Sequence, residues 1–136
     1  MDALTFYFDR CFGARLPECI RKARPPFTIE YQHDPKGRHK FKEETPDDVW
    51  LATVGMNGWI VFSHDRKFHQ IEAECAAIKQ HKIGCFYLWG SNASTWEKLV
   101  CFVRAHKQVI EAAKNTPRPF IFEVDQKGRL LPVEIP

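Results

Sequence analysis

Residues 4–9, LTFYFD, and residues 59–65, WIVFSHD, are two apolar and aromatic segments that each end at an aspartate. Neither segment has the period of an amphipathic helix, so both are predicted to be buried strands. Between them, residues 16–23 and 47–58 have the spacing of apolar positions and the start and stop residues of short helices. Strands that alternate with helices predict an α/β fold with a mostly parallel sheet.

The rest of the chain continues this alternation. Residues 119–135 contain two strand-like runs around the turn sequence DQKG, which predicts a β-hairpin added to the sheet. The longest helix is predicted at 95–115, and its apolar stripe is expected to consist of Trp96, Leu99, Val103 and Ile110. Further strands are expected at 27–34 and 85–89, and a further helix at 71–84.

Length and composition are those of an ordinary globular protein. With 136 residues, of which 44% are hydrophobic, the chain can bury a core, and a single compact domain is expected. The longest apolar run is far shorter than the roughly 20 residues that cross a bilayer, and the first ten residues are acidic where a signal peptide is basic. Five cysteines without CxxC spacing indicate reduced thiols. We therefore expect a cytoplasmic protein that does not bind a membrane.

The net charge of +3 is unevenly distributed along the chain. Residues 1–42 contain nine Lys and Arg against five Asp and Glu, whereas residues 43–136 contain eleven against twelve. The basic side chains are concentrated at 21–26 and 36–42. Such segments can attract a polyanion through their local field, or they can be solvated loops, and the charge pattern alone leaves both interpretations open.

Four aspartates stand at positions where chemistry is commonly found in α/β proteins. Asp9 and Asp65 follow predicted strands, and Asp47 and Asp48 open a predicted helix. Ligands bind outside the carboxyl ends of parallel strands, so these side chains share one rim if the first and third strands are neighbours. Clustered carboxylates repel one another and are commonly held by a hard divalent cation such as Mg²⁺ or Mn²⁺. Asp47 or Asp48 alone is also explained as an ordinary helix start.

Three segments carry a resemblance to a known family. They are FYFDRCFG (6–13), PDDVWLATVG (46–55) and GWIVFSHDRKF (58–68). In this order they resemble PIN-like nuclease domains, especially compact VapC-type toxin relatives, over roughly residues 4–70. The resemblance implies a three-layer α/β/α fold with a mostly parallel sheet, in which residues 1–136 form a single PIN-like domain and the hairpin at about 118–136 is an addition.

The same resemblance implies a set of metal-binding and catalytic residues. Asp9 matches the first metal-binding aspartate of the family, and Asp65 matches the last, with Ser63 where the family often has Thr. Asp47 matches the middle aspartate, because its spacing of 18 residues from Asp65 fits the family pattern. Asp48 is the substitute candidate for this middle position.

A further family ligand has no clear counterpart in this chain. Full-length PIN nucleases carry an additional Glu on a helix between the first and middle aspartates, and the corresponding stretch is too short here. Asp34, Glu43 and Glu44 are alternatives, although none lies in a matching motif. Glu72 and Glu74 are also candidates, and a solvated helix face explains them as well.

The implied function is that of a metal-dependent endoribonuclease, the toxin of a toxin–antitoxin pair, which hydrolyses RNA phosphodiesters with a metal-activated water. Its cofactor is Mg²⁺ or Mn²⁺, and Arg10, Arg66 and Lys67 are expected to contact the RNA backbone. A cognate antitoxin and a second copy in a homodimer are the implied protein partners.

Two other functions remain open on the sequence. One is a catalytically inactive PIN-like binding module, because the fourth acid is missing. The other is a receiver or flavodoxin-like Mg²⁺-binding domain, which needs a Gly- or Ser/Thr-rich loop after the first strand. The turn at 10–17, RCFGARLP, does not contain such a loop.

Overall fold

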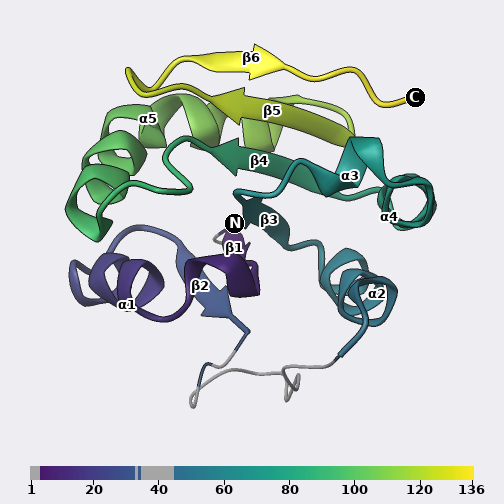
Figure 1. Ribbon diagram of the computed structural model, residues 1–136, viewed down its shortest axis with the longest axis horizontal. Coiled ribbons are helices and arrows are strands. Elements are labelled where there is room, and N and C mark those ends of the chain that lie inside the picture. The colour runs from purple at the N-terminus through teal and green to yellow at the C-terminus, as the bar shows by residue number, and fades with distance from the viewer. Residues whose placement is uncertain (1–3, 33, 35–44) are drawn as a thin grey trace.

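The computed structural model describes residues 4–32, 34 and 45–136, and Figure 1 shows their arrangement. A six-stranded sheet has the order β2-β1-β3-β4-β5-β6. All neighbouring strands are parallel except β5 and β6, which form the antiparallel hairpin predicted at the C-terminal end. The strands are β1 (Thr5–Phe8), β2 (Thr28–Tyr31), β3 (Ile60–Ser63), β4 (Gly84–Leu88), β5 (Phe120–Val124) and β6 (Leu130–Pro132).

Helices cover both faces of the sheet. On one side, α1 and α5 pack against Phe6, Phe8 and Phe62, and on the other side α2, α3 and α4 pack against Tyr7 and Val61 (Figure 1). This confirms the predicted three-layer α/β/α architecture. The helices are α1 (Arg15–Lys22), α2 (Asp47–Asn57), α3 (Lys67–Gln70), α4 (Glu72–Gln80) and α5 (Thr95–Asn115), with a short 3-10 turn η1 (Arg10–Phe12).

The central strands are continuous apolar runs because both of their faces are buried. Along β1, Phe6 and Phe8 belong to one core, and Tyr7, between them, belongs to the other. All three side chains are fully inaccessible to solvent. Parallel strands under two helical layers are expected to lack polar alternation. This is why the segments 4–9 and 59–65 were recognisable as buried strands.

The predicted apolar stripe of α5 is wrong at Trp96 and Val103. Trp96 and Val103 are 71% and 54% exposed, and Leu99 and Ile110 are only partly buried at the margin of the core. Small residues allow the helix to lie close to the sheet, whereas large apolar residues dominated the sequence pattern. The helix instead buries Phe102 and a row of residues spaced by four. This row consists of Cys101, Ala105, Val109 and Ala113.

One helix boundary and one additional helix also differ from the prediction. The helix expected at 71–84 ends at Gln80, because Lys82 adopts a left-handed conformation (φ 51°) that a helix cannot continue through. The chain also forms a separate short helix, α3, directly after Asp65, which the sequence pattern did not indicate.

Among the helices of the described segments, none combines the length and the apolar character needed to span a bilayer.

A charged cluster stabilises the edge of the sheet at β2. Arg21 of α1 lies between three acidic side chains, of which Asp34 and Glu30 are almost completely buried. Its Nη1 is 2.9 Å from Glu18 Oε1, and its Nη2 donates to the carbonyl oxygen of Ile29 on β2. Arg21 also forms an ion pair with Asp34. An edge carbonyl that is bonded in this way is not open to strand addition.

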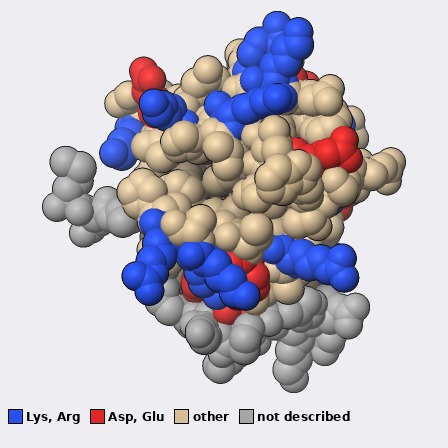
Figure 2. Space-filling model, turned by 90° about the vertical axis from the view of Figure 1, so that its left-hand side faces the viewer, with Lys and Arg blue, Asp and Glu red and all other residues tan. Residues whose placement is uncertain are grey.

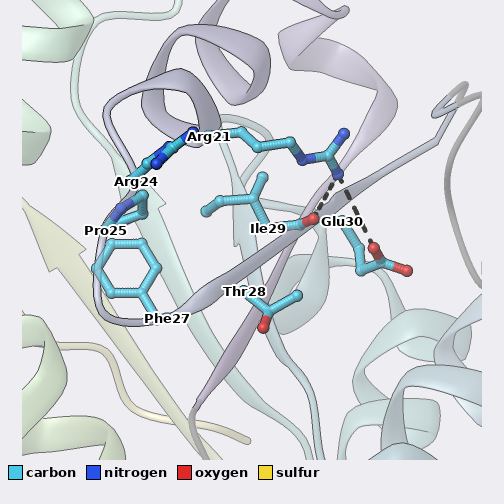
Figure 3. Close-up of a pocket in the computed structure, with 7 residues that line it drawn as sticks. All are labelled: Arg21, Arg24, Pro25, Phe27, Thr28, Ile29 and Glu30. Atoms are coloured by element: carbon cyan, nitrogen blue, oxygen red, sulfur yellow. Dashed lines mark hydrogen bonds and ion pairs between the residues drawn. The ribbon is translucent and has the colours of Figure 1, made fainter.

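The pocket beside this cluster has a volume of about 350 Å³ and is drawn in Figure 3. Its lining residues include Arg21, Pro25, Phe27 and Glu30. On the face shown in Figure 2, the Lys and Arg side chains of the described residues form separate groups divided by uncharged side chains, so these residues do not make a continuous basic surface there. The expected basic segment at 36–42 lies outside the described residues.

Replacing Arg21 tests how far the fold depends on this cluster. In Arg21→Met the aliphatic stem is kept, but the buried carboxylates of Asp34 and Glu30 lose their shared cation. Loss of one partner from a buried ion pair leaves an uncompensated charge, so we expect the free energy of unfolding to fall by about 3 kcal/mol. Urea denaturation measures the change, with the exposed neighbour Lys22→Met as the matched control. Equal destabilisation by the two variants would contradict the argument.

Candidate active site

Asp9 is held at the carboxyl end of β1 by bonds to both of its neighbouring segments. The Asp9 amide donates to the carbonyl of Phe62 at 3.0 Å, which extends the pairing of β1 with β3 by one residue. Asp9 Oδ1 accepts the Arg10 amide at 2.6 Å, and Oδ2 accepts the Ser63 hydroxyl at 3.1 Å. The side chain is completely buried. A buried carboxylate with this many fixed bonds is rigidly placed.

Asp65 is brought to Asp9 by a tight turn after β3. The Asp65 amide donates to Ser63 Oγ at 3.1 Å, so a single hydroxyl connects the two aspartates. Possible ligand atoms of Asp9, Asp65 and Cys11 all lie within 4.8 Å of one another. The condition for a shared rim is met, because the first and third strands are neighbours, and this pairing is what brings Asp9 and Asp65 together.

Asp47 lies on the same rim, but it reaches Asp9 through a lysine. The Lys67 ammonium is 3.2 Å from Asp9 Oδ2 and 2.9 Å from Asp47 Oδ2. Asp47 is the first residue of α2, and its Oδ1 accepts the indole N–H of Trp50 at 2.8 Å. Within the described part of the chain, Asp47 is outside the close group of Asp9, Asp65 and Cys11.

The charges of this group are strongly coupled to their surroundings. Burial raises the pKa of Asp9, although the Lys67 ammonium and the Ser63 hydroxyl act in the opposite direction. Burial also acts to raise the pKa of Asp47, but the hydrogen bonds from Lys67 and Trp50 outweigh it, and the pKa lies below its usual value. Burial acts to lower the pKa of Lys67, and the two carboxylates more than compensate and raise it. Lys67 is therefore a cation at neutral pH.

Cys11 is a neighbour of the two aspartates that the sequence analysis did not select. Its Sγ accepts the backbone N–H of His64 at 3.4 Å and lies 3.8 Å from Ser63 Oγ. Although the residue is exposed as a whole, burial of the thiol raises its pKa to about 11. The thiol is thus protonated at neutral pH and is a poor nucleophile. Its position two residues after Asp9, in a tight turn, was the available sequence signal.

The other expected acids that the structure describes are not part of the close group. Asp48 is exposed and, with Glu74, lines a groove of about 510 Å³ between α2 and α4. Glu72 is exposed at the start of α4. Asp34 is held by Arg21, as described above. Glu43 and Glu44 lie outside the described residues.

The basic residues expected at an RNA backbone have different surroundings. Arg10 and Arg66 are exposed next to the acidic rim. Arg66 forms an ion pair with Glu123, and its guanidinium lies 5.8 Å from the ring centre of Tyr87. Lys67, in contrast, is only 12% exposed, and both of its ion pairs are with acids of the rim.

One polar contact beside the rim could not be predicted from the sequence. His69 Nδ1 lies 2.9 Å from the hydroxyl of Tyr87, which is on β4. The two residues are 18 positions apart and belong to different elements, so only the packing of α3 over the sheet brings them together.

Comparison of the sequence with known proteins identifies the family of this chain. A family model described as a PIN like domain matches residues 4–90, which include Asp9, Asp47 and Asp65. No curated protein and no solved structure gives a significant match. Since the matched segment is more than half of the chain, the protein belongs to the PIN-like domain family, whose members are typically nucleases that use divalent metal ions.

Proposed function

We propose that the protein is a metal-dependent endoribonuclease. The observation that supports this proposal is the meeting of Asp9 and Asp65 beside Ser63, at the carboxyl ends of two adjacent parallel strands, in a chain of the PIN-like family. Asp47 lies on the same rim and shares the Lys67 ammonium with Asp9. Two neighbouring carboxylates at this edge are a typical arrangement for binding a divalent cation and a phosphate-containing substrate.

The donor atoms fit Mg²⁺ or Mn²⁺. Carboxylate and hydroxyl oxygens are hard ligands of the kind that these ions prefer, and Asp9, Asp65 and Ser63 supply them within one small volume. The Cys11 thiol lies beside these oxygens, but it is protonated at neutral pH and the thiolate is the metal ligand.

In the proposed cleavage reaction these residues would have two roles, metal binding and RNA binding. Asp9, Asp47 and Asp65 would hold the ion, with Asp48 as the substitute for Asp47. The bound ion supplies Lewis-acid chemistry, since it promotes ionisation of an attacking water and stabilises negative charge on the phosphate. Arg10 and Arg66, exposed next to the rim, would hold the RNA through its backbone phosphates.

A more specific biological role rests on the resemblance to VapC-type toxins. In this role the protein acts in the cytoplasm as the toxin of a toxin–antitoxin pair, is blocked by a cognate antitoxin, and forms a homodimer. RNA is the substrate.

RNA cleavage tests the proposal directly. Wild-type protein is expected to cut labelled single-stranded RNA in Mg²⁺ or Mn²⁺ and to stop cutting when EDTA removes the ion. Asp9→Asn and Asp65→Asn keep the size of the side chain but remove a charged ligand, so we expect the rate to fall at least about a hundredfold. Gel analysis of the cleavage products over time gives the rates.

Glu111→Gln is the matched control, since Glu111 is an exposed carboxylate on α5. It should cleave RNA at the wild-type rate. Equal rates in wild type, Asp9→Asn and Asp65→Asn would reject the assignment. RNA binding without cleavage, at any concentration of either ion, would instead identify an inactive PIN-like binding module.

The toxin role has its own test. Induced expression of the wild-type chain in a bacterial host should arrest growth, because uncontrolled RNA cleavage stops translation. Asp65→Asn, expressed to the same level, should permit normal growth. Growth arrest by both proteins would show that any toxicity is unrelated to the acidic rim.

A further inference from the structure

Lys67 occupies a position that the proposed function does not explain. Its ammonium lies between Asp9 and Asp47, at 3.2 Å and 2.9 Å from one oxygen of each. The lysine side chain is 12% exposed, Asp9 is completely buried, and Asp47 is 10% exposed. Lysines that contact a nucleic-acid backbone lie at the surface with their charge in water. Lys67 instead points its charge into the protein.

We propose that Lys67 is an internal competitor of the divalent ion. In this inference, which rests on the proposed metal-dependent function, the ammonium offsets part of the negative charge of Asp9 and Asp47 when no ion is bound. An ion that binds to both carboxylates must displace it. The affinity of the site for Mg²⁺ or Mn²⁺ then depends on the free energy of replacing the ammonium by the ion, and not only on the binding of the ion to empty carboxylates.

The bonds of Asp9 explain why displacement is required. Its Oδ1 accepts the Arg10 amide, and its Oδ2 accepts both the Ser63 hydroxyl and the Lys67 ammonium. Oδ2 of this buried side chain thus already has two donors, as many as it has lone pairs. Oxygen ligands lie about 2.1 Å from Mg²⁺. An ion that close to Asp9 Oδ2 would be next to the ammonium, and two cations in a site with little water repel each other strongly.

The position of Lys67 in the chain allows its ammonium to move away from the two carboxylates. It is the first residue of α3, a helix of four residues that follows the exposed residues Asp65 and Arg66. Its ammonium lies 6.0 Å from the ring centre of Trp50, which is also the residue that binds the other oxygen of Asp47. A lysine side chain has four rotatable bonds, so the ammonium can leave the carboxylates while the backbone stays in place.

Metal binding by variants of Lys67 tests the inference. Lys67→Met keeps an unbranched apolar side chain of similar length and removes the charge. We expect it to bind Mn²⁺ at least about tenfold more tightly than wild type, measured as the Kd from calorimetry and from the electron paramagnetic resonance signal of free Mn²⁺. Lys67→Arg keeps the charge and should remain close to wild type. Lys107→Met, at an exposed lysine of α5, is the matched control and should not change the Kd.

Thermal stability provides a second readout. Without a divalent ion, Lys67→Met should have a lower Tm than wild type, because two buried acids have lost their cation. Saturating Mn²⁺ should raise the Tm of Lys67→Met more than that of wild type, since tighter binding stabilises the folded state more. An equal or smaller increase, together with an unchanged or weaker Kd, would overturn the inference.

Wild-type protein allows a measurement that does not depend on a variant. Reductive methylation followed by mass spectrometry reports the accessibility of each lysine amine. Lys67 should react slowly without a divalent ion and several-fold faster with saturating Mn²⁺, while Lys107 should react at the same rate in both conditions. A Lys67 rate that Mn²⁺ leaves unchanged would also overturn the inference.

The outcomes separate this inference from the proposed function. Metal-dependent RNA cleavage that requires Asp9 and Asp65, combined with no gain of Mn²⁺ affinity in Lys67→Met, rejects the role of Lys67 alone. Tighter Mn²⁺ binding by Lys67→Met without RNA cleavage by any variant rejects the nuclease and keeps the cation exchange. No Mn²⁺ binding by either protein rejects both.

Discussion

The burial of Asp9 is the constraint around which the rim of the sheet is organised. A carboxylate without solvent access must be neutralised and fully hydrogen-bonded, or it destabilises the fold. Here a backbone amide, the Ser63 hydroxyl and the Lys67 ammonium all point at its two oxygens. The elements that supply these groups, η1, β3 and α3, are thereby fixed relative to β1. Stability and the geometry of the candidate site depend on the same few bonds.

The two-sided core makes this placement precise enough for chemistry. Because β1 and β3 are buried on both faces, a shift of either strand by one residue would exchange the side chains of the two cores. The register that pairs Phe8 with Phe62 is therefore strongly specified, and it determines that Asp9 and Ser63 come next on adjacent strands. Aromatic packing in the two cores thus decides which polar groups meet at the rim.

Sequence patterns predicted the parts of the fold that depend on local chemistry. Buried strands that end in aspartate, an α/β alternation and a C-terminal hairpin are each visible in a short window, and the convergence of Asp9 and Asp65 followed from the parallel topology. The prediction of the buried face of α5 was wrong at Trp96 and Val103, because the sequence pattern gave weight to large apolar residues. Close packing on a sheet instead selects small residues such as Ala105 and Ala113. Which residues face each other across a core is not a local property.

The candidate site was less predictable for a related reason. A lysine next to an acidic rim has two physically reasonable positions, outward toward a phosphate or inward toward the acids, and the sequence is the same for both. Lys67 points inward because α3 begins immediately after the turn at Asp65. Its ammonium lies 6.0 Å from the ring centre of Trp50, 5.2 Å from that of Phe68, and beside Asp9. A fold that must exist before its metal ion arrives needs some counter-charge for its ligands, and a tethered cation supplies one at a fixed effective concentration. That cation cannot diffuse away, so the free energy that stabilises the metal-free rim is also the free energy that an incoming ion must exceed.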